Sequence, residues 1–205
     1  MSIKLIIFDL DGVILDKDIH YHSLNAAIDT YFPAGILTYD EHERYYNGLP
    51  TREKLELLTL YRGLPKNLYN DIWYKKQRET SHMLYELKPD HEKVELLAKL
   101  SKDFKLAMAT NAIKDTANIA LQSLGLDGFL NPIISNKDVR YTKPYPDCYW
   151  RCMTAHKVLP KETLIIEDSA VGIKGAKDSG AHVYECIEPK YLNYNYITKY
   201  INYIK

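Results

Sequence analysis

The apolar positions of the chain follow two patterns, and each predicts a different kind of structure. Ile3 to Phe8 is an apolar run of strand length, interrupted only by Lys4, which is typical of a strand buried on both faces of a parallel sheet. Further strands are expected at residues 104–109, 133–134, 163–166 and 181–187. Segments with helical spacing alternate with them, at residues 91–100, 113–124, 148–156 and 171–179. This alternation indicates an α/β fold with a doubly wound, Rossmann-like parallel sheet.

The stretch between the first strand and residue 87 has a different pattern, because it contains no strand signal. Helices are expected there at residues 18–31, 41–46, 51–61 and 67–87, separated by breaks rich in Pro and Gly. We therefore expect an α/β core made of residues 1–16 and 87–205, with a helical cap of residues 17–86 inserted after the first strand. Near the C-terminus, Leu192, Tyr196, Tyr200 and Ile204 lie at helical spacing, which predicts a terminal helix docked on the core.

Composition narrows the class of protein. The 205 residues are 46% hydrophobic, and 27 basic residues balance 27 acidic ones. A neutral balance argues against broad binding to nucleic acid or to anionic membranes, and no apolar run is long enough for a membrane helix. The N-terminus lacks the features of a signal peptide. The 3 cysteines, Cys148, Cys152 and Cys186, form no metal-binding pair and are expected to be buried thiols, so we expect a cytoplasmic protein. The pattern predicts no oligomeric state.

Polar residues follow the predicted strands at the points where a parallel sheet binds its ligands, which is at the carboxyl ends of the strands. These residues are Asp9, Asp11, Thr110, Asn111, Glu167 and Asp168, and Lys143 stands in the loop before the helix at 148. Taken singly, each has a plainer explanation as part of a solvated turn, a helix cap or the surface. Their order along the chain and their attachment to strand ends favour one shared site.

The charges of these residues suggest the chemistry of that site. Asp9, Asp11, Glu167 and Asp168 would place several carboxylates in one crevice, which is costly unless a cation neutralises them. Ligands that are all oxygens point to Mg²⁺. Lys143 would supply a fixed positive charge for a nucleophile or for a phosphoryl oxygen.

Donors for the other phosphoryl oxygens are expected from Thr110 and Asn111, which precede a predicted helix. The predicted ligand is therefore a small phosphorylated metabolite.

Four segments of the chain resemble the motifs of the haloacid dehalogenase-like (HAD) hydrolase superfamily, in the family's order. The first is IIFDLDGV around Asp9, and the second is Thr110-Asn111. The third is KPYPD from Lys143, and the fourth is IIEDS around Asp168, followed by a glycine-containing helix. The helical insert resembles the cap of the subgroup that contains β-phosphoglucomutase and many small sugar-phosphate phosphatases.

The resemblance implies a role for each residue of these motifs. Asp9 is the expected nucleophile, forming an aspartyl-phosphate, and Asp11 is the expected general acid and then base. Mg²⁺ would bind the Asp9 and Asp168 carboxylates and the Asp11 main-chain carbonyl, with Glu167 in support. The presence of Asp11 favours phosphoryl chemistry over dehalogenation, because a halide leaving group needs no such acid.

The expected function is that of a hydrolase: a Mg²⁺-dependent phosphatase of sugar, polyol or short-chain acid phosphates. Two alternatives stay open at this point. One is a phosphoryl transferase resembling β-phosphoglucomutase, and the other is a catalytically silent module that binds phosphorylated metabolites.

Within the cap, the segment from Gly48 to Arg52 resembles the loop that sets substrate specificity in this subgroup. Arg52 is expected to hold a second anionic or hydroxyl-rich end of the substrate, unless it is only a solvated residue in the first turn of a helix. His20 and His22 are expected to be exposed. The cap lysines are expected to be solvated, namely Lys54, Lys66, Lys75 and Lys76.

Overall fold

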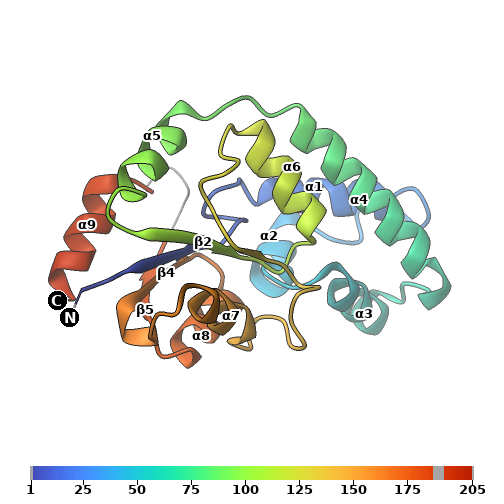
Figure 1. The fold of residues 1–205 in the computed structure, drawn as a ribbon. Coiled ribbons are helices and arrows are strands. Elements are labelled where there is room, and N and C mark those ends of the chain that lie inside the picture. The colour runs from blue at the N-terminus through green and yellow to red at the C-terminus, as the bar shows by residue number, and fades with distance from the viewer. Residues whose placement is uncertain (1, 187–191, 205) are drawn as a thin grey trace.

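Within the residues that the structure describes, 2–186 and 192–204, five parallel strands form the centre of the molecule in the order β3-β2-β1-β4-β5 (Figure 1). The structure is a computed structural model. The strands are β1 (Leu5–Phe8), β2 (Lys105–Ala109), β3 (Ile133–Ile134), β4 (Thr163–Glu167) and β5 (His182–Glu185). The predicted α/β fold with a parallel sheet is confirmed. The last predicted strand reached Ile187, which lies outside the described residues.

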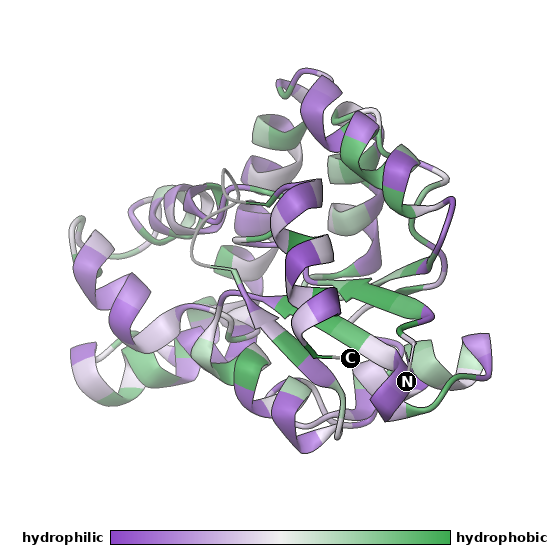
Figure 2. Cartoon of the chain, turned by 90° about the vertical axis from the view of Figure 1, so that its left-hand side faces the viewer, coloured by the Kyte–Doolittle hydropathy of each residue, from purple (hydrophilic) through white to green (hydrophobic). Residues whose placement is uncertain are grey.

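Helices cover both faces of the sheet (Figure 1). One face carries α5 (His91–Leu100), α6 (Lys114–Ser123) and α9 (Tyr194–Tyr203), and the other carries α7 (Asp147–His156) and α8 (Ala170–Asp178), with a short 3-10 turn, η3 (Pro160–Glu162), leading into β4. Strand β1 contributes side chains to the apolar layers on both faces of the sheet, since Ile6 and Phe8 pack on one face while Leu5 and Ile7 pack on the other. This double burial explains why the first strand is apolar at every position. Figure 2 shows mostly hydrophobic strands at the centre and helices in which hydrophilic and hydrophobic residues alternate.

The segment after β1 is helical, as expected. It contains α1 (Asp18–Ile28), α2 (Tyr39–Glu41), a π-helical turn η1 (His42–Tyr46), α3 (Thr51–Arg62), a 3-10 turn η2 (Lys66–Leu68) and α4 (Tyr69–Tyr85). These helices enclose a cluster of buried apolar residues of their own, which includes Leu24, Leu55 and Ile72. We use the word cap for this part of the chain; its limits at residues 17 and 86 stay a prediction.

Several predicted boundaries and faces differ from the observed ones. The helix expected from residue 67 is preceded by a 3-10 turn, so α4 begins at Tyr69. In α9 the buried side chains are Ile197 and Ile201, whereas Tyr196 is 52% exposed. The expected helix is present, and of the predicted stripe Leu192 is buried while Tyr200 and Ile204 pack partly buried against the core. Only Tyr196 was assigned wrongly, because the more apolar Ile197 takes the buried position beside it.

Two expectations from composition concern the cysteines and membrane-spanning helices. All three cysteines are buried, and Cys148 and Cys152 are free thiols. None of the helices in the described ranges is both long enough and apolar enough to span a membrane.

Candidate active site

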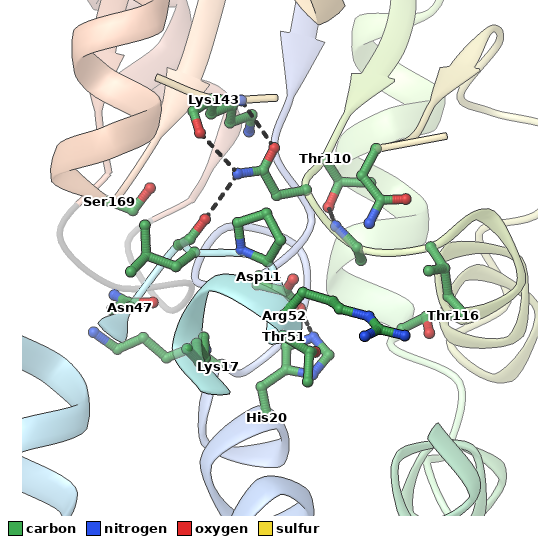
Figure 3. A pocket seen from close by; sticks show the side chains of 18 of the residues that line it. Asp11, Lys17, His20, Asn47, Thr51, Arg52, Thr110, Thr116, Lys143 and Ser169 are labelled. Carbon is green, nitrogen blue, oxygen red and sulfur yellow. Dashed lines mark hydrogen bonds and ion pairs between the residues drawn. The ribbon is translucent and has the colours of Figure 1, made fainter. Parts of the chain in front are cut away.

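The sheet register brings the predicted motifs to one edge. Phe8 of β1 lies level with Met108 of β2 and with Ile166 of β4, so the loops that follow these three strands leave the sheet side by side. The cavity above them has a volume of about 110 Å³ and is seen from close by in Figure 3. Of the residues predicted from the sequence, those that line it are Asp9, Asp11, Gly48, Arg52, Thr110, Asn111 and Lys143.

Lys143 is the buried cation of the core. Its Nζ lies 2.5 Å from Asp9 Oδ1 and also donates to Glu167 Oε1. Burial lowers the pKa of Lys143, but the carboxylates of Asp9 and Glu167 outweigh burial and raise that pKa well above its ordinary value. The ammonium group is therefore charged, and two carboxylates share its charge.

Asn111 holds the loops around the cavity together. Its Oδ1 accepts from the Lys143 N–H at 3.0 Å, and its Nδ2 donates to Gly48 O at 2.9 Å and to Lys143 O at 3.3 Å. The side chain of Asn111 thus ties loops to each other, instead of pointing freely at a phosphate as the sequence suggested. Thr110 Oγ1 accepts from the Ala112 N–H at 2.9 Å, which leaves the hydroxyl hydrogen of Thr110 able to donate into the cavity.

Glu167 is a fully buried carboxylate with several donors. Tyr149 donates its hydroxyl hydrogen to Glu167 Oε1 at 2.9 Å, and the Asp168 N–H and Ser169 N–H donate to Oε2 at 3.1 and 3.3 Å. A Cβ added at Gly172 would lie 2.1 Å from Glu167 Oε1, so only glycine at the start of α8 leaves room for this carboxylate. These contacts fix Glu167 in one orientation.

Asp9, Glu167 and Asp168 form an acidic cluster in which one oxygen of each lies within 4.8 Å of the others. Burial and then the charge of Glu167 raise the pKa of Asp168 to about 7, and the same two causes raise the pKa of Asp9 well above its ordinary value. Asp168 Oδ1 is buried and, within the described residues, accepts no hydrogen bond. Crowded carboxylates with an unsatisfied oxygen fit a hard divalent cation.

Asp11 faces a different environment on the cap side of the cavity (Figure 3). Its Oδ1 lies 2.8 Å from His20 Nε2, and Lys76 Nζ lies 2.9 Å from His20 Nδ1. Because an ammonium group can only donate, the Lys76 contact assigns the imidazole hydrogen to Nε2, facing Asp11. Burial raises the pKa of Asp11, but the contact with His20 and, after it, the charges of Lys76 and Lys54 outweigh burial, and the net effect is a lowered pKa.

The cap loop at Gly48 and Arg52 meets the core closely. Gly48 has φ +76°, and a Cβ there would lie 2.4 Å from Val171 Cγ2, so glycine lets this loop rest on α8. Arg52 is exposed at the cavity rim, where its Nη2 donates to Asn70 Oδ1 at 2.6 Å.

The sequence of the chain matches a known protein family. The profile of the family described as haloacid dehalogenase-like hydrolase matches residues 6–185. The chain belongs to this family. The match spans all five strands and the helical segment between β1 and α5, which confirms the resemblance noted in the sequence, and the chain is therefore an enzyme of a hydrolase family.

Two curated proteins are similar in sequence to this hydrolase over most of its length. It is 29% identical over 181 residues to a "Phosphorylated carbohydrates phosphatase" of Thermotoga maritima, covering 86% of this chain and 82% of that protein. It is 28% identical over 189 residues to "Pyrophosphatase PpaX" of Halalkalibacterium halodurans, covering 88% of this chain and 81% of that protein.

Solved structures show the same fold. The β-phosphoglucomutase of Clostridium difficile superposes with a TM-score of 0.81 at 20% identity, covering 98% of both chains. A putative β-phosphoglucomutase from Thermotoga maritima gives a TM-score of 0.67 at 28% identity, covering 89% of this chain and 85% of that chain.

The structure of the hydrolase also corrects three expectations about the cap. His20 is not an exposed residue, because its side chain is only 13% exposed against Asp11. Lys54 and Lys76 are each 6% exposed and line the cavity, so they are not solvated. Their positions carried a signal that we missed. Lys76 lies four residues after Ile72 and four before Thr80, on the buried stripe of α4, and residues at this spacing share one helix face.

Proposed function

We propose that this hydrolase is a Mg²⁺-dependent phosphatase of small phosphorylated metabolites, such as sugar, polyol or short-chain acid phosphates. One observation carries the proposal: Asp9 and Asp11 line the same cavity but sit in opposite electrostatic surroundings. Neighbouring carboxylates crowd Asp9, whereas Asp11 is held by an imidazole. Such a pair of carboxylates suits a nucleophile and a separate proton carrier. The phosphatase names of two curated relatives support the same reaction class.

In the first step, a carboxylate oxygen of Asp9 attacks phosphorus and the bond from phosphorus to the leaving oxygen breaks. The leaving oxygen takes a proton from Asp11. The pKa of Asp11 is lowered in the free protein, but a phosphate anion beside it raises that pKa again, because like charges disfavour ionisation. The binding of the substrate thus favours the protonated form of Asp11, and Asp11 then donates this proton to the leaving oxygen.

In the second step, water attacks the phosphorus of the aspartyl-phosphate, Asp11 accepts a proton from the water, and the bond to Asp9 breaks to release phosphate. Lys143 holds the carboxylate of Asp9 in place through both steps, and the hydroxyl of Thr110 suits a phosphoryl oxygen. Mg²⁺ held by Asp9, Asp168 and the main-chain oxygen of Asp11, with Glu167 alongside, would offset the repulsion between the nucleophile and the phosphate.

Phosphate release from a panel of metabolite phosphates, with Mg²⁺ and with a chelator, tests this function. We expect release that depends on Mg²⁺ and that Asp9→Asn abolishes. Asp127→Asn changes an exposed aspartate of the core and should behave as the wild type. No release from any ester by the wild type would refute the phosphatase.

The alternatives predict other results in the same experiment. A transferase would interconvert sugar phosphates without net release of phosphate, and the phosphatase names of the curated relatives do not favour it. A silent module would capture beryllium fluoride with Mg²⁺ at Asp9 and yet hydrolyse no ester.

A further inference from the structure

Two lysines of the cap bring positive charge into the cavity without a carboxylate partner. Lys54 on α3 and Lys76 on α4 both line the cavity and are each 6% exposed. Within residues 2–186 and 192–204, no ion pair of up to 4.0 Å joins either ammonium group to a carboxylate. Their side-chain partners are imidazoles: Lys54 Nζ lies 2.9 Å from His42 Nε2, and Lys76 Nζ lies 2.9 Å from His20 Nδ1.

The imidazole beside Lys54 cannot neutralise it. Burial and the charge of Lys54 lower the pKa of His42 to about 3, so His42 is neutral near pH 7 and its Nε2 accepts a hydrogen bond from Lys54. Burial and the repulsion of Lys76 lower the pKa of Lys54 to about 7, and the more distant charges of Asp11 and Glu43 offset only part of this fall. A buried charge that lacks a counter-charge is costly, and an anion placed in the cavity beside it would remove that cost.

The other cations around the cavity are already engaged. Lys143 is shared by Asp9 and Glu167, Lys17 is paired with Glu43 at the rim, and Arg52 donates to Asn70. The positive charge that no carboxylate contacts therefore lies on the cap wall of the cavity, at Lys54 and Lys76, where Asp11 compensates it only in part. Asp9, the proposed nucleophile, lies at the core end. A phosphoryl group placed at Asp9 leaves the rest of the substrate facing the cap wall.

We propose that Lys54 binds a second anionic group of the substrate, a phosphate or a carboxylate carried by the leaving group. His42 positions Lys54 by accepting one of its hydrogens, and Lys76 adds positive charge nearby while it holds His20. This inference rests on the proposed phosphatase function and narrows its substrate class to diphosphates, bisphosphates and phosphorylated acids. It assigns the second anion to a buried lysine of α3 instead of the exposed Arg52.

Matched substrates test the assignment. Phosphoglycolate and ethyl phosphate are alike in size, but only the first carries a carboxylate, and inorganic pyrophosphate carries a second phosphate. We expect the wild type to prefer the substrates with a second anion. Lys54→Met should lower the ratio of kcat/KM for phosphoglycolate or for pyrophosphate to that for ethyl phosphate by roughly 10- to 100-fold, as for a lost charged hydrogen bond. Lys66→Met, an exposed lysine of the cap, should leave both ratios as in the wild type.

A measurement of ligand affinity tests the same inference without catalytic turnover. In the Asp9→Asn background, calorimetry should show that Lys54→Met weakens the binding of pyrophosphate or of phosphoglycolate by a similar factor, with circular dichroism confirming the fold. A drop with pyrophosphate identifies a second phosphate, and a drop with phosphoglycolate identifies a carboxylate. Unchanged ratios and unchanged affinities in Lys54→Met would overturn the inference. Absence of phosphate release from every ester would instead overturn the phosphatase, and the measurement of affinity would still decide the role of Lys54.

Discussion

Replacing Lys54 by Met tests whether the cap of the free protein carries an uncompensated charge. Methionine keeps nearly the length of the lysine side chain and removes the ammonium group. The pKa of Lys54 is about 7 in the folded protein, against an ordinary value of 10.5, with burial as the largest cause and the charge of Lys76 as the next. Because the folded state binds this proton less tightly than the unfolded chain, the protonated lysine destabilises the fold.

The size of the effect follows from that difference. Each pH unit between the two pKa values is worth about 1.4 kcal/mol, so the gap corresponds to about 5 kcal/mol. The variant also loses the hydrogen bond from Lys54 to His42, which offsets about 1 kcal/mol. We therefore expect Lys54→Met to be more stable than the wild type by about 4 kcal/mol at pH 6, which is a large fraction of the stability of an ordinary domain.

The pH dependence has a definite sign. Below pH 7 both states hold the proton and the full penalty applies to the wild type. Between about 7 and 10.5 the folded state loses its proton first, so the penalty fades as the pH rises, and above that range it is absent. The advantage of the variant should shrink accordingly.

Urea unfolding of the metal-free proteins at a series of pH values measures this difference. Titrations of groups that do not interact with Lys54 cancel when the variant is subtracted from the wild type, whereas those of His42, His20 and Asp11 do not, because the charge of Lys54 acts on them. Lys66→Met, at the surface of the cap, should lie within about 0.5 kcal/mol of the wild type at every pH. Equal stabilities at pH 6, or a difference that stays constant with pH, would show that the charge of Lys54 is already compensated. The case for a second substrate anion would then lose its basis.

Three further outcomes are expected. Tyr149→Phe removes the donor 2.9 Å from Glu167 Oε1 and should lower the free energy of unfolding by about 1–2 kcal/mol while weakening Mg²⁺ binding, as urea unfolding and calorimetry would show. The pKa of Asp168, raised to about 7, means that its charge destabilises the metal-free protein increasingly as the pH rises from 3.8 to 7. Mg²⁺ should therefore raise the Tm more at pH 8 than at pH 5, and Asp168→Asn should lose most of this difference. Arg52→Ala breaks an exposed contact with Asn70, so it should cost at most about 1 kcal/mol of stability. It should change the ranking of substrates by kcat/KM, and an equal fall for all substrates would exclude a role in specificity.

The core part of the site could be predicted because its geometry follows from strand order alone. Parallel strands in register end at the same edge, so residues directly after β1, β2 and β4 meet whatever the helices between them do. Asp9, Thr110 and Asp168 are such residues, and the register of Phe8 with Met108 and Ile166 brings the ends of their strands together.

The cap part could not be predicted in the same way, because its side chains depend on how each helix is rotated. His20 and His22 are two residues apart on α1, which places them on nearly opposite sides of the helix. One faces Asp11 and the other is exposed. No local pattern distinguishes them, since the choice is made by the packing of α1 against α4.

Lysines add a second difficulty, because a long aliphatic side chain can be buried on an apolar stripe that the ammonium group seems to forbid. Lys54 stands beside Leu55 and four residues before Leu58 on the buried face of α3. Counting lysine as polar removes that position from the predicted core. A lysine at helical spacing from apolar core positions, as Lys54 is from Leu58, is the signal that would have found it.

The buried lysines of the core and of the cap have different partners, and this difference has a consequence for the choice of substrate. In the core, Lys143 lies between Asp9 and Glu167, and the acidic cluster that they form with Asp168 leaves an excess of negative charge that suits a bound cation. On the cap wall, Lys54 contacts only a neutral imidazole, although the charges of Asp11 and Glu43 reach it from a distance. A single phosphate, with a cation at the acidic cluster, involves the core alone, whereas a second anion on the substrate would also pair with the cap wall. The chemistry can thus be common to many phosphate esters, while the cap selects among them by the charge of the leaving group.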